Sequence, residues 1–184
     1  GRHGQVPAGH GLAQAHDEIA TQLTANKRKE ALTDLVGKLE DQVAEGASFA
    51  KIEAYRASFA NIIAEGASFA GAELQRANFA GARLAGASFE KAELGRADFD
   101  KAVLTGTKFS FANLSRADLS GATFETTPMF DRAFMFLTRI EGLDLSAAAG
   151  LEQAQIDLAC GDASTKLPAG LSAPTTWPCP AERE

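Results

Sequence analysis

The sequence contains few of the residues on which most enzymes and nucleic-acid-binding proteins depend. Its 184 residues include one Trp, one Tyr, two Cys and three His. The 18 Lys and Arg are outnumbered by 24 Asp and Glu, which gives a formal net charge of −6, so the basic surface typical of nucleic-acid binding is absent. No run of 18 apolar residues occurs. We therefore expect no direct nucleic-acid binding and no membrane-spanning helix.

The histidines and cysteines are confined to the two ends of the chain. His3, His10 and His16 lie near the N-terminus, and Cys160 and Cys179 lie in the C-terminal tail. Neither group has the spacing of a known metal cage, and a Cys–His pair would need the two ends to meet. No paired carboxylates, Ser–His pair or phosphate-binding loop is recognisable. The sequence therefore predicts no catalytic residue, no cofactor and no metal site, and we do not expect an enzyme.

A five-residue repeat dominates the rest of the chain. From Gly46 the sequence falls into rows of twenty that begin GASFAKIEAYRASFANIIAE and GASFAGAELQRANFAGARLA. Each row holds four units of the form Ala-x-(Phe/Leu)-x-x, a period that matches neither a helix nor a strand. Two inward residues followed by a turn, four times over, close a square coil, and such coils stack at about 4.8 Å. The pattern predicts an all-β repeat solenoid.

Residues twenty apart are predicted to lie above one another inside this solenoid. At two units the large and the small inward residue exchange places, Ile52 with Ala54 and Ile62 with Ala64. This exchange keeps the interior volume constant, as close packing requires. We count Phe134 as a further central residue. The predicted core ladder consists of Phe49, Phe69, Phe89, Phe109, Phe59, Phe79, Phe99, Leu74, Leu94, Leu114, Leu84 and Leu104.

Both ends of the solenoid have candidate covers. An apolar stripe at helical spacing precedes the repeats and predicts a helix that caps the open end or docks a partner. A second, short helix is predicted over Gly150–Ala159. The stripe consists of Leu32, Leu35, Val36, Leu39 and Val43. The predicted parts are an N-terminal extension over 1–26, a capping helix over 27–45, the repeats over 46–147, and a C-terminal helix with an irregular tail over 148–184.

The repeat weakens after Phe124. The segment Thr126-Thr127-Pro128 predicts a bulge or loop, because Pro has no amide proton for the ladder. Units resume near Ile140 in a frame that requires one extra residue.

Units such as AELGR, ADFDK, ANLSR and ADLSG resemble those of the pentapeptide-repeat family of bacterial proteins, over residues 46–147. The resemblance implies a right-handed quadrilateral β-helix, here of about five coils. It is a weak guide to function, because one fold hosts many roles. Some family members imitate duplex DNA and bind DNA topoisomerases, including gyrase. A DNA-mimicking modulator of a topoisomerase is therefore the alternative to a non-catalytic scaffold for protein–protein interaction.

The C-terminal segment ACGDASTKLPAGL also resembles the closing segment of many bacterial pentapeptide-repeat proteins, many of which are exported. The resemblance favours a disulfide between Cys160 and Cys179, which would imply an oxidising compartment, and hence a periplasmic or exported protein. Two free thiols in a cytoplasmic protein are the alternative.

The charge of the repeats argues against DNA mimicry. Between Ala47 and Thr126, nine Lys and Arg balance nine Asp and Glu, whereas duplex DNA carries one negative charge per ~1.7 Å of its axis. We therefore predict a scaffold that binds an unidentified protein partner, as a monomer or as a homodimer joined through an end of the solenoid.

Two surfaces are candidates for this interaction. Arginines spaced by twenty are predicted to form a column beside a column of glutamates, either as a self-neutralising ion ladder or as a docking stripe for an acidic partner. On another side, apolar residues interrupt a small and polar face. The candidate interaction residues are Arg56, Arg76, Arg96, Arg116, Glu53, Glu73, Glu93, Ile63 and Val103.

Overall fold

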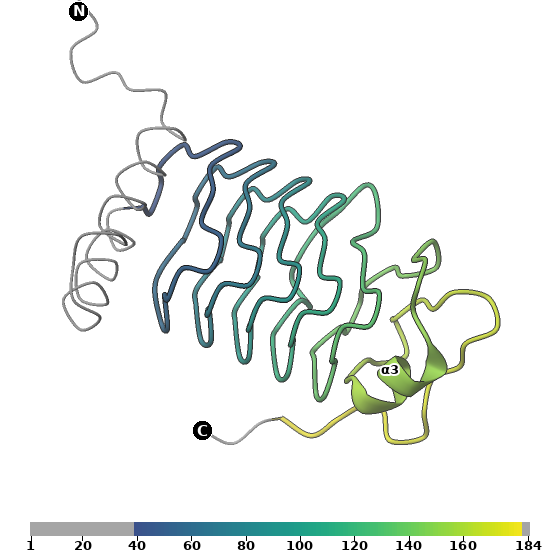
Figure 1. The fold of residues 1–184 in the computed structure, drawn as a ribbon. Helices are drawn as coiled ribbons and strands as arrows, with labels where there is room; N and C mark the ends of the chain where they lie inside the picture. Colours follow the sequence, from purple (N-terminus) through teal and green to yellow (C-terminus); the bar gives the residue numbers. More distant parts are fainter. Residues whose placement is uncertain (1–38, 182–184) are drawn as a thin grey trace, which may run out of the picture.

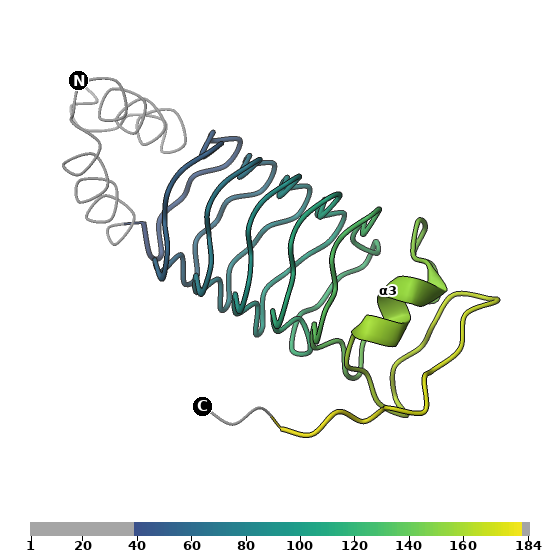
Figure 2. The ribbon, with the colours of Figure 1, turned by 60° about the horizontal axis from the view of Figure 1, so that its bottom comes forward.

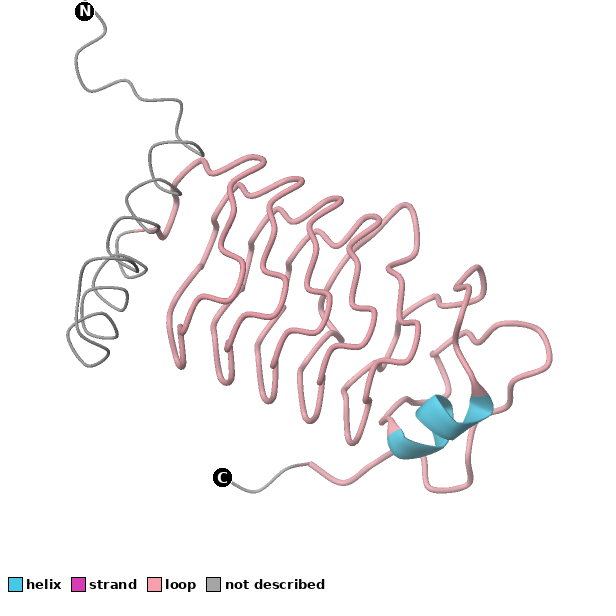
Figure 3. Ribbon diagram, viewed as in Figure 1, coloured by secondary structure: helices cyan, strands magenta, loops and turns pink. Residues whose placement is uncertain are grey.

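The computed structural model describes residues 39–181 as a straight rod of stacked four-sided coils (Figure 1). The coils follow one another along the rod in chain order, and α3 (Gln153–Leu158) lies at the C-terminal end, as the turned view also shows (Figure 2). Within the described residues, α3 is the one helix, and Figure 3 draws the coils as loops and turns. Each side of a coil meets the next coil through a single parallel β-bridge, which is too short to count as a strand.

Backbone pairing between residues twenty apart holds the coils together. Ser68 forms parallel bridges with both Ser48 and Ser88. Its neighbour Phe69 donates its amide proton to the Ser88 carbonyl oxygen over 2.7 Å. In most units the last residue turns the corner in the left-handed region, as at Asn61 (φ 58°) and Gly66 (φ 68°), whereas Gly121 does not. Gly and Asn adopt this conformation at little cost, but it also occurs at Lys and Arg corners such as Lys51 and Arg76, so the geometry of the stacked coils imposes it.

Phenylalanine rings fill the shaft as two opposed stacks. The ring centroids of Phe69 and Phe89 lie 4.9 Å apart and are nearly parallel, and those of Phe59 and Phe79 lie 4.8 Å apart. The two stacks also contact each other edge to face, as Phe69 does Phe79 at 5.5 Å and 89°. Offset stacks and T-shaped contacts are the geometries that aromatic quadrupoles favour. All twelve residues of the predicted core ladder are at most 1% exposed.

The two units with exchanged residues are packed like the others. Ile52, Ala54, Ile62 and Ala64 are all at most 1% exposed. The shaft therefore accepts the large side chain at either inward position, provided that the unit keeps one large and one small residue.

The predicted extra residue enters the coil that follows Thr123. The bridge from Val103 to Thr123 spans twenty residues, whereas the next bridge, from Lys108 to Met129, spans twenty-one. The inserted segment contains Pro128, which is buried. This insertion shifts the central position to Phe130, which stacks on Phe109 at 5.6 Å.

The shift makes the prediction for Phe134 wrong. Phe134 is not central: it forms a parallel bridge with Asn113 on the outside of the rod and is 49% exposed. Met135, its neighbour, occupies the shaft and is fully buried. A frame of twenty continued past the insertion places Phe134 inward, whereas the inserted residue moves its side chain to the outer face.

The boundary between the predicted capping helix and the repeats is also wrong. Residues 39–45 already form the solenoid: Leu39 is buried in the core, and Val43 forms a bridge with Ile63. The amide of Ala44 donates to the Ile63 carbonyl oxygen at 2.7 Å. Leu39 and Val43 satisfy the helical spacing by coincidence, since they are also the central and the outer residues of five-residue units. Residues 1–38 of the predicted extension and capping helix lie outside the described residues.

The C-terminal part continues the solenoid before it closes it. The short helix predicted over Gly150–Ala159 is observed as α3, and bridges from Arg139 to Cys160 and from Asp144 to Lys166 carry the pairing beyond residue 147. The buried Gln155 of α3 donates to two main-chain carbonyl oxygens of the coil below, those of Phe130 (2.8 Å) and Ala133 (3.0 Å). The bond to Ala133 satisfies a buried acceptor, and the bond to Phe130 adds to the one that its carbonyl oxygen accepts from the Ala133 amide at 3.0 Å.

Candidate interaction surfaces

The filled shaft leaves the outer surface as the place for any function of the described coils. The interior from Leu39 to Leu145 is one continuous cluster of buried apolar residues. Within residues 39–181, no group of His, Cys, Asp and Glu could hold a metal ion, and no helix has the length and apolar character needed to cross a membrane. The three histidines lie outside the described residues.

The four arginines form one edge of the rod, here called the arginine edge (Arg56, Arg76, Arg96 and Arg116). Each has a φ of 59° or 60°, so each occupies the corner position of its coil. The backbone repeats in step, because the amide of each arginine donates to a carbonyl oxygen of the next coil, as Arg76 does to Gly95 over 2.7 Å. Arg76, Arg96 and Arg116 line an open depression together with Gly95 and Ser115.

Aromatic side chains contact the first and the last arginine of this edge. The Arg56 guanidinium carbon lies 5.3 Å from the centre of the Tyr55 ring, and that of Arg116 lies 5.1 Å from the centre of the Phe136 ring. Such cation–π contacts hold the guanidinium groups in place. The hydrogen bond from Arg56 lowers the pKa of the exposed Tyr55 hydroxyl, and the charges of Arg56 and Arg76 lower it further against an opposing effect of desolvation.

The predicted glutamates line the side next to this edge, here called the glutamate face (Glu53, Glu73 and Glu93). Parallel bridges join Glu53 to Glu73, Glu73 to Glu93, and Glu93 to Asn113. The Asn113 side-chain amide donates to Glu93 over 3.1 Å. The structure thus brings the arginine edge and the glutamate face together as two adjacent rows of opposite charge.

Ile63 and Val103 lie on a different side of the rod. They share a column with Val43 and Arg83, and both are partly exposed. Arg83 separates them and forms an ion pair with Glu65 at 3.3 Å. The apolar residues are therefore interrupted by an ion pair and do not form one continuous apolar strip.

An apolar group that the sequence analysis missed lies at the C-terminal half of the rod. Phe111 (56% exposed), Met129 (45%) and Phe134 (49%) wrap around the edge where the glutamate face meets the preceding side. We call these three residues the apolar corner. A frame corrected by one residue after Thr123 would have found Met129 and Phe134, and Phe111 could have been found as a bulky residue at a corner position.

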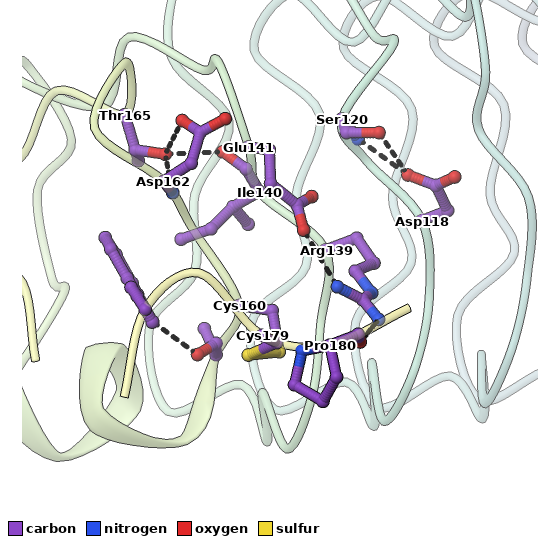
Figure 4. Close-up of polar contacts among 12 residues, drawn as sticks. Asp118, Ser120, Arg139, Ile140, Glu141, Cys160, Asp162, Thr165, Cys179 and Pro180 are labelled. Carbon is purple, nitrogen blue, oxygen red and sulfur yellow. Dashed lines mark hydrogen bonds and ion pairs between the residues drawn. A yellow bond between two sulfur atoms is a disulfide. The ribbon is translucent and has the colours of Figure 1, made fainter. Parts of the chain in front are cut away.

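The C-terminal tail is tied back onto the end of the solenoid. Cys160, which is fully buried, forms a disulfide with Cys179, and the Arg139 guanidinium donates to the Pro180 carbonyl oxygen (2.8 Å) and pairs with Glu141 (3.0 Å) (Figure 4). The Trp177 indole N–H donates to the Ala159 carbonyl oxygen at 2.7 Å.

Polar turns above the disulfide complete this end. Asp162 accepts hydrogen bonds from Ser164 and Thr165, and these bonds, with Ser164 the largest contributor, lower the pKa of its carboxyl group. The Thr165 hydroxyl reaches the Ile140 carbonyl oxygen at 3.3 Å (Figure 4).

The repeated geometry agrees with a family comparison. The profile described as pentapeptide repeats matches residues 55–90 and 82–121, with eight copies of the repeat. The chain is a pentapeptide-repeat protein. The family predicted from units such as AELGR is thus confirmed. No catalytic family is indicated, and a comparison with curated proteins gives no significant match.

Solved structures of other pentapeptide-repeat proteins are similar to this one. A trypsin-treated form of QnrB1, a plasmid-mediated fluoroquinolone resistance protein, has a TM-score of 0.52 at 18% identity, over 71% of this chain and 59% of QnrB1. The match thus spans less than two thirds of that protein, and it shows that this pentapeptide-repeat protein shares its right-handed β-helix solenoid fold. A protein from the thylakoid lumen of Arabidopsis thaliana is 29% identical (TM-score 0.33), over 73% of this chain and 85% of that one. HetL, from the cyanobacterium Nostoc and involved in heterocyst differentiation regulation, is 23% identical (TM-score 0.32), over 72% and 66%.

Proposed function

We propose that this pentapeptide-repeat protein is a non-catalytic scaffold, a rod of about five coils that binds a protein partner through its outer surface. The observation that carries the proposal is the filled shaft: Phe69 and the other ladder residues are buried and stacked on one another, so the coils offer no internal pocket for a substrate. The same stacking fixes the outward side chains in straight columns. A rigid surface of that kind favours association, because little side-chain and loop freedom is lost on binding.

The arginine edge and the glutamate face are the surfaces that we propose for the partner. Rows of opposite charge at fixed spacing give a partner both orientation and register. The Ile63–Val103 side is a second candidate surface. The Cys160–Cys179 disulfide supports a periplasmic or exported location for this scaffold, since such bonds persist in oxidising compartments.

Pull-down of the native partner followed by mass spectrometry tests the proposal. We expect the double variant Arg76→Glu/Arg96→Glu to lose partners that the unmodified chain retains. The matched control is Lys101→Glu/Lys166→Glu, which changes the net charge by the same amount at two exposed positions outside the arginine edge, the glutamate face and the Ile63–Val103 column. An unchanged set of partners in the Arg76→Glu/Arg96→Glu variant would exclude the arginine edge, and no specific partner for any form would exclude the scaffold.

Modulation of a topoisomerase is the alternative that the same experiment can reveal. QnrB1 is a fluoroquinolone resistance protein by name, but the shared fold carries no function across 18% identity. The balance of nine basic and nine acidic residues between Ala47 and Thr126 gives no specific support for mimicry of DNA. Tight binding of purified gyrase at low salt would replace the scaffold proposal with this one.

A further inference from the structure

The apolar corner exposes three large apolar side chains to solvent, and the packing of the shaft does not require apolar residues at these outer positions. Phe111, Met129 and Phe134 have about half of their surface exposed. In the same columns, earlier coils carry Lys91, Ser88 and Glu93. A contiguous exposed apolar patch on a soluble protein is typical of an interaction site.

Phe111 adds a cost in the backbone. Its φ of 60° places a bulky aromatic residue in the left-handed region, where a non-glycine residue costs roughly 1–2 kcal/mol. Two coils earlier the corner of this column is Gly71, and the intervening coil has Lys91. Lys91 has the same backbone conformation (φ 59°), so the fold requires a left-handed corner here but does not require an aromatic side chain at it.

The three side chains form one surface around a single edge. Met129 and Phe134 belong to the same coil and form bridges with Lys108 and Asn113 of the coil before it. Phe111 lies between those two in sequence, and its amide donates to the Asp131 carbonyl oxygen at 2.9 Å. The Phe134 ring stacks on Phe136 with centroids 6.3 Å apart, which joins the apolar corner to the arginine edge.

The charges around the apolar corner are mainly positive. The three aligned stretches that build it are 88–96, 108–116 and 129–137, and they contain five Lys and Arg against three Asp and Glu, a net charge of +2. A partner with apolar side chains and carboxylates matches both features. A membrane of anionic lipids matches less well, because the acidic residues would face its headgroups. The basic residues are Lys91, Arg96, Lys108, Arg116 and Arg132, and the acidic residues are Glu90, Glu93 and Asp131.

We propose that the apolar corner binds an acidic amphipathic segment of a partner protein. The apolar side chains of the segment lie on Phe111, Met129 and Phe134, and its carboxylates lie beside the surrounding Lys and Arg. The inference rests on the scaffold function proposed above and names the kind of partner that the scaffold takes.

A displayed library of random peptides, panned against the disulfide-bonded chain, tests this inference. We expect enrichment of peptides in which Asp or Glu alternates with Phe, Leu or Ile. Synthetic copies are then titrated into the chain by calorimetry. The test variant is Phe111→Asn/Met129→Ser/Phe134→Asn, in which each new residue is one that the same kind of position holds elsewhere in the rod, as at Asn61, Ser88 and Asn113. The matched control is Leu158→Gln, which replaces an exposed apolar residue of α3 (40% exposed) that belongs to neither the apolar corner nor the arginine edge.

The expected result is a loss of affinity of more than about tenfold in the triple variant, since buried aromatic anchors dominate such interfaces, with unchanged affinity in Leu158→Gln. Equal binding to the triple variant would overturn the inference, as would enriched peptides without acidic residues. Peptides lost only in Arg76→Glu/Arg96→Glu would overturn it while leaving the scaffold function intact. Binding to vesicles of phosphatidylcholine and phosphatidylglycerol without any peptide binding would overturn it in favour of a lipid surface.

Discussion

At the scale of single residues, each position of the five-residue unit has one physical task. The central residue fills the shaft, the residue before it pairs with the neighbouring coils, and the last residue turns the corner with positive φ. Because the tasks differ, the same substitution has different consequences at different positions of the unit.

In a unit whose other inward residue is Ala, the central position should tolerate Leu and reject a second Ala. Phe79 is buried between Phe59 and Phe99, with ring centroids 4.8 and 5.2 Å away. We expect Phe79→Ala to lower the free energy of unfolding by about 3–5 kcal/mol, through lost burial and a cavity. Phe99→Leu should cost less than about 1.5 kcal/mol, since Leu119 occupies the next position of that column. Urea titration measures both, and equal losses would contradict the packing argument.

Two corner glycines allow the cost of the left-handed backbone to be distinguished from the cost of steric crowding. Gly86 has a φ of 68° and open space where a side chain would start, whereas a Cβ at Gly81 (φ 69°) would meet the side-chain oxygen of Asn61. Gly86→Ala should therefore cost about 1–2 kcal/mol from the left-handed backbone alone. Gly81→Ala should lower the free energy of unfolding by more than Gly86→Ala does, because its new Cβ also meets Asn61. This additional loss should vanish when Gly81→Ala is made in a chain that already carries Asn61→Ala. An excess that persists in the double variant would show that Asn61 is not its cause.

At the scale of elements, α3 packs against the last coils and is bonded to them through Gln155. Its buried Gln155 bonds the carbonyl oxygens of Phe130 and Ala133, and the Gln155 side-chain oxygen accepts from the amide of Glu152. We expect Gln155→Glu to destabilise the chain by about 2–4 kcal/mol in thermal or urea unfolding, because a carboxylate cannot donate to the two buried acceptors. The control is Gln153→Ala in the same helix, whose exposed hydrogen bonds should contribute less than about 1 kcal/mol. Similar losses for the two variants would contradict the stabilising role of the buried Gln155 bonds.

The position of the C-terminal tail against the solenoid depends on the disulfide between Cys160 and Cys179. Cys160 and Cys179 close a loop with a sequence separation of 19, and removing a cross-link of this size typically costs about 2–4 kcal/mol. Trp177, the one tryptophan of the chain, donates to Ala159 in the tied tail. Reduction, or Cys160→Ser/Cys179→Ser, should shift its fluorescence emission to longer wavelength. An emission spectrum that is the same before and after reduction would show that the tail stays docked without the bond.

Much of the coil architecture was predictable because the same arrangement of inward residues recurs in every row of twenty. Phe69 and Phe89 could be placed from spacing alone, and the extra residue after Thr123 followed from the later frame. The details at the ends were not predictable in this way. Leu39 satisfies both a helical and a five-residue spacing, and Phe134 changes sides when the frame moves by one. Two residues of the apolar corner, Met129 and Phe134, were missed for the same reason, since their positions depend on the insertion.

At the scale of the whole molecule, the rod is a one-dimensional stack in which each coil contacts only its neighbours. The stability of such a stack is approximately a sum of coil and interface terms, so the interior coils, with a neighbour on each side, open least often. The C-terminal end is fixed further by α3 and the disulfide, and coil pairing there includes the bond from the Ile140 amide to the Cys160 carbonyl oxygen at 2.8 Å.

Hydrogen exchange should show this gradient directly. We expect the slowest exchange at interior amides such as those of Phe69 and Leu94, whose acceptors lie in the next coil, and faster exchange at Ala44 near the N-terminal end of the described coils. Reduction of the disulfide should speed exchange at Ile140 and Leu145, which donate to Cys160 and Lys166, and leave Phe69 unchanged. Uniform protection along the rod, or faster exchange of all these amides on reduction, would contradict this expectation. Either result would show that the coils open as one cooperative unit. The ends could then not unfold while the interaction surfaces stay folded.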